Sequence, residues 1–185
     1  MTQPIDIRRV PDTFRPIRVL DAYSCIGGAT KGTNRARNAA IGRTYPRLIA
    51  PTRAALESTG RPYVMENVAG SEVRKDLRLC GEMFGLDVIM HRYFELGGWS
   101  APQPAHPRHR GYVRGWRHGV YREGPYVAAY GQGGGKATVQ EIRDAKGIDW
   151  STDHLRLREA LPPAYTEWIA HAWLATLAPT LEVAA

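Results

Sequence analysis

The sequence predicts an α/β fold with a doubly wound sheet, and three features of the chain carry that prediction. Residues 17–23 (IRVLDAY) form a short apolar and β-branched run, as expected for a buried strand. A glycine-rich segment, SCIGGATKG at 24–32, follows it and leads towards a helix. A second buried run, PYVMENV at 62–68, ends in Glu66 and Asn67. This order of elements is typical of doubly wound sheets, which bind ligands at the carboxyl ends of their strands.

The other elements are predicted from local patterns. Residues 1–16 are polar and contain prolines, which indicates an extended arm. Apolar residues at helical spacing predict a helix over 48–59. Further elements are a short helix or turn at 77–86, a third strand at 88–96 and a short helix at 138–146. An amphipathic helical stretch over 155–177 is broken by Pro162 and Pro163.

Composition limits the classes of protein that fit this chain. The 185 residues carry a net charge of +7, which favours an acidic partner, with nucleic acid first. A hydrophobic fraction of 43% is typical of a globular chain with a buried core. No apolar run reaches the roughly 20 residues of a membrane span, and we expect no secretory signal and no membrane partner. Cys25 and Cys80 are too few for a disulfide framework, so we expect a reduced cytoplasmic setting.

Three groups of residues offer chemistry at the predicted ligand edge. Glu66 and Asn67 place a carboxyl group beside a carboxamide, which together can grip a flat heterocycle, although a solvated strand end is an alternative. Arg92 can direct its guanidinium at a carboxylate or phosphate, and a cross-strand salt bridge is the alternative there. Gly27 and Gly28 allow backbone amides to approach a ligand closely, but a tight packing turn has the same residues.

A basic and aromatic tract runs from His106 to Arg122. Arginines interleaved with aromatic rings suit contact with phosphates and bases, and a solvated basic loop is the plainer alternative. The candidate DNA-binding residues are Arg108, Arg110, Arg114, Trp116 and Arg117. His106 and His109 would bind a metal only with ligands from elsewhere. Because no cysteine lies near them in the sequence, we predict no metal site.

Taken in order, these segments resemble the DNA cytosine-5 methyltransferases, especially the short bacteriophage-encoded type. The matching pieces are LDAYSCIGGATKG for motif I, RPYVMENVAGS for motif VI, MHRYFEL for motif VIII and LREALPPAYTEWIAHA for motif X. The resemblance covers roughly residues 17–100 and 126–175. It implies a Rossmann-like, S-adenosylmethionine-dependent methyltransferase core over 17–96 and 126–178, with 97–125 as a small irregular target-recognition region.

The resemblance also implies a mechanism that acts on double-stranded DNA in a bacterial or phage-infected cell. In the family, a cysteine thiolate attacks C6 of a flipped-out cytosine, and C5 then takes the methyl group from S-adenosylmethionine. By position, Glu66 would pair with the N3 edge of the base, Asn67 would hold the loop, and Arg92 would help to position the base. The cofactor site would be lined by Asp21, Tyr23, Gly27, Gly28, Ala164 and Tyr165.

The chain departs from the family pattern at the nucleophile. The family's catalytic cysteine lies in a Pro-Cys dipeptide between motifs I and VI, and this sequence contains no Pro-Cys. Glu66 follows Gly28 by only 38 positions, so we expect a core that is incomplete in its first half. We place the missing segment at the Gly32–Thr33 junction, as a true deletion or as an omitted stretch. A catalytically inactive DNA-binding remnant is therefore the main alternative, and a tRNA-modifying relative is a third.

Overall fold

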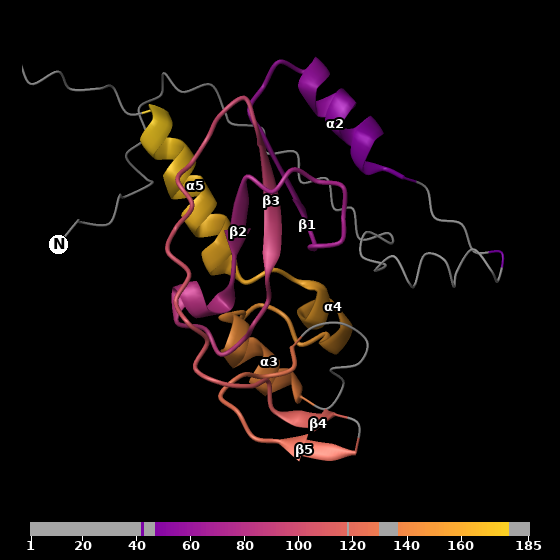
Figure 1. The fold of residues 1–185 in the computed structure, drawn as a ribbon, viewed down its shortest axis with the longest axis vertical. Helices are drawn as coiled ribbons and strands as arrows, with labels where there is room; N and C mark the ends of the chain where they lie inside the picture. The colour runs from indigo at the N-terminus through magenta and orange to yellow at the C-terminus, as the bar shows by residue number, and fades with distance from the viewer. Residues whose placement is uncertain (1–41, 43–46, 118, 130–136, 178–185) are drawn as a thin grey trace, which may run out of the picture.

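The computed structural model describes Gly42 and residues 47–117, 119–129 and 137–177. In chain order the elements are α2 (Ile49–Ser58), β1 (Tyr63–Asn67), β2 (Leu77–Leu79), a 3-10 turn (Gly81–Phe84), β3 (Arg92–Gly97), β4 (Gly115–Arg117), β5 (Val120–Arg122), α3 (Val139–Lys146), α4 (His154–Glu159) and α5 (Pro163–Leu177), as Figure 1 shows. The predicted arm at 1–16, the strand at 17–23 and the glycine-rich turn lie outside the described residues.

The main sheet has three strands in the order β1-β3-β2, and both pairs are antiparallel. Tyr63 lies opposite Gly97 at one end of the sheet, and Leu79 lies opposite Arg92 at the other. The mixed α/β class is confirmed, but the parallel arrangement of a doubly wound sheet is not found among the described strands. The connection from β2 to β3 contains a single 3-10 turn, whereas parallel neighbours need a longer crossover, usually a helix.

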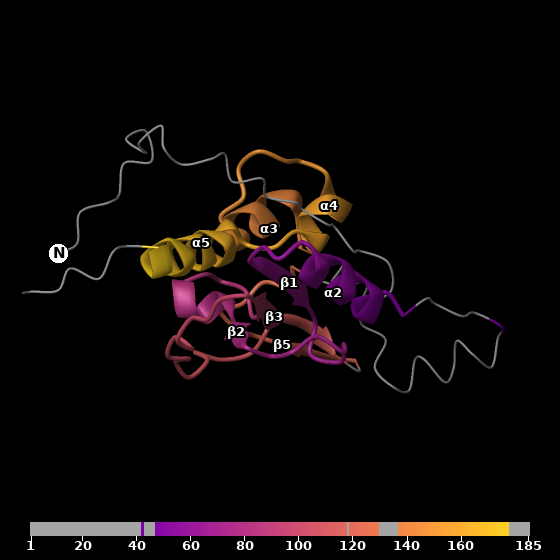
Figure 2. The same cartoon turned by 90° about the horizontal axis from the view of Figure 1, so that it is seen from above.

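Helices flank this sheet on opposite sides, as the end-on view in Figure 2 shows for α5 and α2. Side chains alternate along β3, so Phe94 and Leu96 point to one face while Glu95 points to the other. On the α5 side, the buried core consists of Leu77, Leu79, Phe94, Leu96, Tyr165 and Ile169. On the other side, Arg53 of α2 reaches Glu95.

A second core cluster joins the chain before β3 to the C-terminal helices. It consists of Val88, Met90, Val127, Ala129, Ile142, Ala145, Ile148 and Leu157. Helix α3 begins at a capping box of Thr138 and Glu141 and ends at Gly147, whose φ of 67° suits glycine. Asp153 caps α4, and α5 begins at Pro163, which has no amide hydrogen to leave unpaired. The helices predicted at 48–59, 138–146 and 155–177 are thus confirmed, with the break at the proline pair.

Lys146 is fully buried and caps the C-terminal end of α4. Its ammonium group donates to the carbonyl oxygens of Leu157 at 2.7 Å, Arg158 at 3.1 Å and Ala160 at 2.8 Å. A helix leaves carbonyls of this kind without partners within the helix. Burial, with the nearby charges of Arg92 and Arg158, lowers the pKa of Lys146 to about 7. The last turn of α3 therefore supplies the cap of the next helix.

The segment after β3 is bound to β2, the edge strand of the sheet. The side-chain amide of Gln103 accepts from the backbone N–H of Arg78 at 2.8 Å and donates to its carbonyl at 2.9 Å. One side chain thus satisfies both backbone groups of an edge residue, as a further strand would. Trp99 also donates to the Tyr63 carbonyl at 3.1 Å. These bonds bring the start of the basic tract alongside the sheet.

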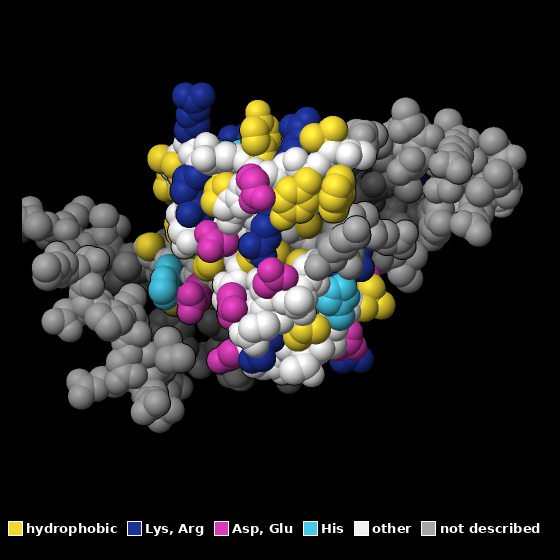
Figure 3. Space-filling model, turned by 90° about the horizontal axis from the view of Figure 1, so that it is seen from below, with side chains coloured by type: hydrophobic (Ala, Val, Ile, Leu, Met, Phe, Trp, Pro, Cys, Tyr) yellow, Lys and Arg dark blue, Asp and Glu magenta, His cyan; other side chains and the backbone are white. Residues whose placement is uncertain are grey.

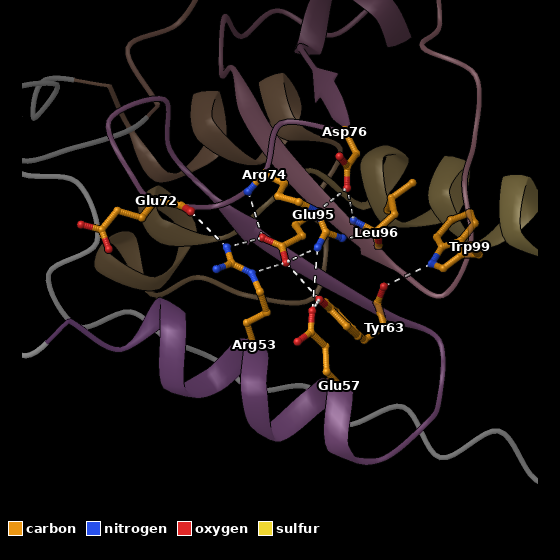
Figure 4. A network of polar contacts seen from close by, with 9 residues as sticks. All are labelled: Arg53, Glu57, Tyr63, Glu72, Arg74, Asp76, Glu95, Leu96 and Trp99. Carbon is orange, nitrogen blue, oxygen red and sulfur yellow. Dashed lines mark hydrogen bonds and ion pairs between the residues drawn. The ribbon is translucent and has the colours of Figure 1, made fainter.

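The buried carboxylate of Glu95 links α2, β1 and the turn before β2, as Figure 4 shows. Arg53 donates to its two oxygens at 2.6 and 2.7 Å, the Tyr63 hydroxyl donates at 3.0 Å, and the backbone amide of Arg74 donates at 2.9 Å. The Glu95 side chain is 0% exposed. Burial by itself would raise the pKa of Glu95, but these hydrogen bonds lower it to about 2.

Glu95→Gln should lower the free energy of unfolding by about 2–3 kcal/mol at neutral pH, because Arg53 loses a buried carboxylate partner. The pKa of Glu95 is about 2 in the folded state against 4.5 ordinarily. Its contribution is therefore complete above about pH 4.5 and is lost as the pH falls towards 2. Chemical denaturation of both proteins across this range should show the difference between them shrinking.

Glu167→Gln, at an exposed position of α5, is the matched control and should leave the unfolding free energy nearly unchanged at every pH. A Glu95→Gln deficit that stays constant as the pH falls would contradict the account of this network.

Candidate functional site

Glu66 on β1 and Arg92 on β3 meet on one face of the sheet. Glu66 is opposite Phe94 in the register, so Arg92, two residues before Phe94, is its diagonal neighbour. The Arg92 Nε atom lies 2.8 Å from Glu66 Oε1. The approach lacks hydrogen-bond geometry, however, and Glu66 Oε1 is buried without a hydrogen-bond partner. The structure thus brings together two residues predicted to be catalytic. Their contact is also the cross-strand salt bridge that the sequence offered as the alternative role of Arg92.

The environment of Glu66 favours its neutral form. Burial raises the pKa of Glu66, and the charge of Arg92 opposes this shift without reversing it. The Glu66 side chain as a whole remains 32% exposed. Arg92 also donates to the His91 carbonyl at 3.1 Å, which limits the directions in which its guanidinium can point. A carboxyl group in this setting can donate a proton to, or accept one from, a ring nitrogen.

Asn67, the third residue predicted to be catalytic, ends β1 and shapes the turn that follows. Its Oδ1 atom accepts a hydrogen bond from the backbone amide of Val68 at 2.9 Å. Ser71 adds a second contact, donating to the Val68 carbonyl at 2.8 Å. The side chain of Asn67 therefore acts on the local backbone, next to the carboxyl group of Glu66.

Most of the predicted cofactor site falls outside the described residues. This is the case for Asp21, Tyr23, Gly27 and Gly28, and for Cys25 and the Gly32–Thr33 junction. Tyr165 is described and fully buried, with its hydroxyl donating to the Met90 carbonyl at 2.7 Å and its ring 5.3 Å from that of Phe84. That side chain belongs to the core between α5 and the chain before β3. The half-buried Ala164 lies in the first turn of α5.

Two of the arginines predicted to bind DNA are held in ion pairs within the protein. Arg110 donates to Glu82 at 3.0 Å and to Asp87 at 2.9 Å, and Arg114 pairs with Glu141. Arg108 is exposed, and no contact holds it to the described part of the chain. Arg110 and Arg114 therefore have structural partners that a DNA phosphate would have to replace, whereas Arg108 does not.

The rest of the tract forms the β4–β5 hairpin, a regular element inside the stretch predicted to be irregular. Trp116 is 58% exposed and packs edge-on against Tyr121, with 5.6 Å between ring centroids. The Arg122 guanidinium lies 5.2 Å from the ring centroid of Tyr112, in a cation–π arrangement. Figure 3 views the molecule from this end and shows apolar side chains beside arginines, lysines and carboxylates. The hairpin offers the exposed aromatic and basic groups that base stacking requires.

A cluster of one cysteine and three histidines escaped the sequence reasoning. The Cys80 Sγ atom lies 3.4 Å from His109 Nε2, and His91 Nε2 lies 3.1 Å from His106 Nε2. Four possible ligand atoms, one from each residue, all lie within 4.8 Å of one another. The expectation that no cysteine lies near His106 and His109 is wrong for the folded chain, because Cys80 lies beside His109. Leu79 pairs with Arg92, and Cys80 and His91 are the next residues along each strand, so the strand register is the signal that would have brought these two together.

Comparisons with known proteins identified no relative of this chain. A scan against protein-family models, a search of curated proteins and a search of solved structures each found no match to the chain. Among the described helices, none is both long enough and apolar enough to cross a membrane.

Arg92→Met should raise the pKa of Glu66 further, because the guanidinium is the group that opposes the effect of burial. A carboxyl group with a raised folded pKa binds its proton more tightly in the folded state. Its effect on stability is therefore most favourable at low pH and is lost as the pH rises through that pKa. Carbon-13 NMR titration of the glutamate carboxyl groups would measure the shift.

Arg156→Met is the matched control, since Arg156 is exposed on α4 and pairs with Asp153. A Glu66 titration that is the same in Arg92→Met and in the wild type would show that the ion pair has no influence on this carboxyl group.

Proposed function

We propose that this chain is a DNA-binding protein of the cytosine-5 methyltransferase type, in which Glu66 and Arg92 recognise a cytosine flipped out of the duplex. The observation that carries the proposal is the 2.8 Å contact between these two side chains. They come from the segments that resemble motifs VI and VIII, and the pairing of β1 with β3 joins them. The proposal takes the described sheet as part of a Rossmann-like core that also includes the strand predicted at 17–23.

The raised pKa of Glu66 supports recognition of cytosine in particular. N3 of cytosine accepts a hydrogen bond, whereas N3 of thymine carries a hydrogen and donates one. Burial raises the pKa of Glu66, so its carboxyl group binds a proton more readily than an exposed one and, when protonated, can donate it to an acceptor nitrogen. Glu66 Oε1 makes no hydrogen bond within the described chain, although it lies 2.8 Å from Arg92 Nε. Flipping is what would bring the base edge to a carboxyl group on a sheet face.

Contact with the rest of the duplex would fall to the exposed basic and aromatic groups. Arg108 has no ion-pair partner among the described residues, and Trp116 and Tyr121 expose their rings on the β4–β5 hairpin. Such groups supply sequence-independent affinity through phosphate contact and stacking. The net charge of +7 favours the approach to an acidic polymer, in keeping with a cytoplasmic protein that meets DNA.

S-adenosylmethionine is the methyl donor that the resemblance implies. Its site would be formed by Asp21, Tyr23, Gly27 and Gly28, together with the start of α5 at Ala164. With the side chain of Tyr165 in the core, that residue would contribute through its backbone.

A second function, DNA binding without methyl transfer, is favoured by the state of Cys80. Its side chain is fully buried and lies 3.4 Å from His109. Burial raises the pKa of the Cys80 thiol, whereas a nucleophilic cysteine needs a lowered pKa. Since the sequence contains no Pro-Cys, Cys80 does not stand in for the family's nucleophile.

Short duplexes with one unpaired cytosine or one unpaired thymine test the base-recognition proposal. The wild type should bind the cytosine duplex about 10-fold or more tightly than the thymine duplex, as a good base-edge contact requires. Glu66→Met, which removes the hydrogen-bond donor at similar length, should lose most of this preference while overall affinity changes little, and Glu167→Met should keep it. Equal binding of both duplexes by the wild type would reject the proposal.

Tritium-labelled S-adenosylmethionine added to the same complexes separates the two functions. Incorporation of label into the cytosine strand, reduced about 100-fold or more by Glu66→Gln, indicates a working methyltransferase. Preference for cytosine without incorporation indicates the DNA-binding remnant.

A second prediction concerns the duplex surface. Replacing Arg108 and Arg117 with alanine should weaken duplex binding and reduce the slope of log K against log salt by about 1–2, because each arginine would neutralise one phosphate. Trp116→Ala should weaken binding by about 1–3 kcal/mol per stacked base without changing the slope. Fluorescence anisotropy over a range of salt concentrations measures both quantities.

Arg156→Ala removes an exposed arginine of α4, outside the basic tract, and should leave the slope unchanged. An unaltered slope in the Arg108 and Arg117 double variant would place the DNA surface elsewhere on the molecule.

A further inference from the structure

We propose that Cys80, His91, His106 and His109 form a structural zinc site, a role independent of DNA recognition. The four residues offer one thiolate and three imidazoles, which are the ligand types that Zn²⁺ prefers. Their possible ligand atoms all lie within 4.8 Å of one another. No other group of three or more histidine, cysteine or acidic residues in the described chain is arranged in this way.

The spacing of the ligand atoms fits a tetrahedral ion. Zinc bonds of about 2.0–2.1 Å to nitrogen and 2.3 Å to sulfur place neighbouring ligand atoms roughly 3.3–3.6 Å apart. Cys80 Sγ and His109 Nε2 are 3.4 Å apart, and the Nε2 atoms of His91 and His106 are 3.1 Å apart. Because the widest pair is within 4.8 Å, a movement of about 1 Å closes the set around one ion.

The orientation of the rings separates this cluster from ordinary aromatic packing. The His91 and His106 rings are nearly parallel, at an interplanar angle of 19°, yet their Nε2 atoms face each other at 3.1 Å. The His106 and His109 rings meet edge-on, with centroids 5.0 Å apart. Three imidazole nitrogens and a sulfur atom within 4.8 Å of one another match the ligand set of a metal site. A hydrogen bond between His91 and His106 alone would not explain why the His109 ring and the Cys80 thiol lie beside them.

Zinc takes these side chains in their deprotonated forms, as a cysteine thiolate and neutral imidazoles. On binding, the thiol proton passes to solvent, the sulfur and three imidazole nitrogens form bonds to zinc, and the site keeps a net charge of +1.

The positions of the ligands show what the ion would stabilise. Cys80 directly follows β2, His91 directly precedes β3, and His106 and His109 belong to the basic tract. The His109 ring also meets that of Tyr126, with centroids 6.0 Å apart, and the Tyr126 hydroxyl pairs with Glu82. Zinc would therefore cross-link the residues that flank β2 and β3 to the basic tract, with Tyr126 packed beside one ligand. A closed site with four protein ligands is typical of structural rather than catalytic zinc.

The experiment uses the full chain, purified without chelators and analysed for bound metal by mass spectrometry. One zinc per chain is expected, and metal-free protein should regain one zinc in competition with a chromogenic chelator. Cobalt in place of zinc should give the strong visible absorption of a tetrahedral ion and a near-ultraviolet thiolate-to-cobalt band. Cys80→Ser and His106→Ala should each weaken zinc binding by roughly 100-fold or more, and Cys80→Ser should abolish the thiolate band.

Matched variants keep the result interpretable if a ligand variant fails to fold. His171→Ala, at an exposed position of α5, changes a histidine outside the cluster and should retain one zinc. His106→Cys should still bind zinc and strengthen the thiolate-to-cobalt band, since it adds a second sulfur ligand. Absence of zinc binding by the wild type, or a thiolate band that persists in Cys80→Ser, would overturn the proposal. Neither outcome depends on the DNA experiments.

Discussion

The buried carboxylate of Glu95 is the interaction on which the arrangement of the sheet depends. It lies on the central strand, and it accepts hydrogen bonds from α2 through Arg53, from β1 through Tyr63 and from the turn before β2 through Arg74. A buried charge of this kind is tolerated only when it is fully paired, so the three segments must adopt one geometry together. That geometry aligns β1 with β3, and the same alignment places Glu66 beside Arg92.

Strand β3 carries a separate task on each of its two faces, because its side chains alternate. Phe94 and Leu96 pack into the core beneath α5, while Glu95 between them points towards α2. Arg92 shares the face of Phe94 and meets Glu66, and His91 enters the Cys–His cluster one residue earlier. One strand and the residue before it thus contribute to the core, to the ion-pair network, to the candidate base-recognition site and to the candidate metal site. A shift of one residue in its register would disrupt all four.

The candidate site divides into parts that motifs could identify and parts that they could not. Glu66 and Arg92 were identified from the sequence, since a polar pair after an apolar run and an arginine within a strand are visible in one dimension. The cluster of Cys80 with three histidines was not, because 26 positions separate Cys80 from His106. The sequence also grouped Arg110 and Arg114 with the DNA-binding residues, because their partners Glu82 and Glu141 lie far along the chain.

Local sequence patterns account for the helices and for the charge of the protein. Helical periodicity and a proline pair act over a few residues, and the helices at 48–59, 138–146 and 155–177 were predicted from local patterns. Tertiary structure alone decided the antiparallel direction and order of the strands, the capping role of Lys146 and the assembly of the Cys–His cluster. These features depend on contacts between distant segments, whose energies become available only when the chain has closed the intervening loops. Patterns within a few residues do not show which distant segments will come into contact.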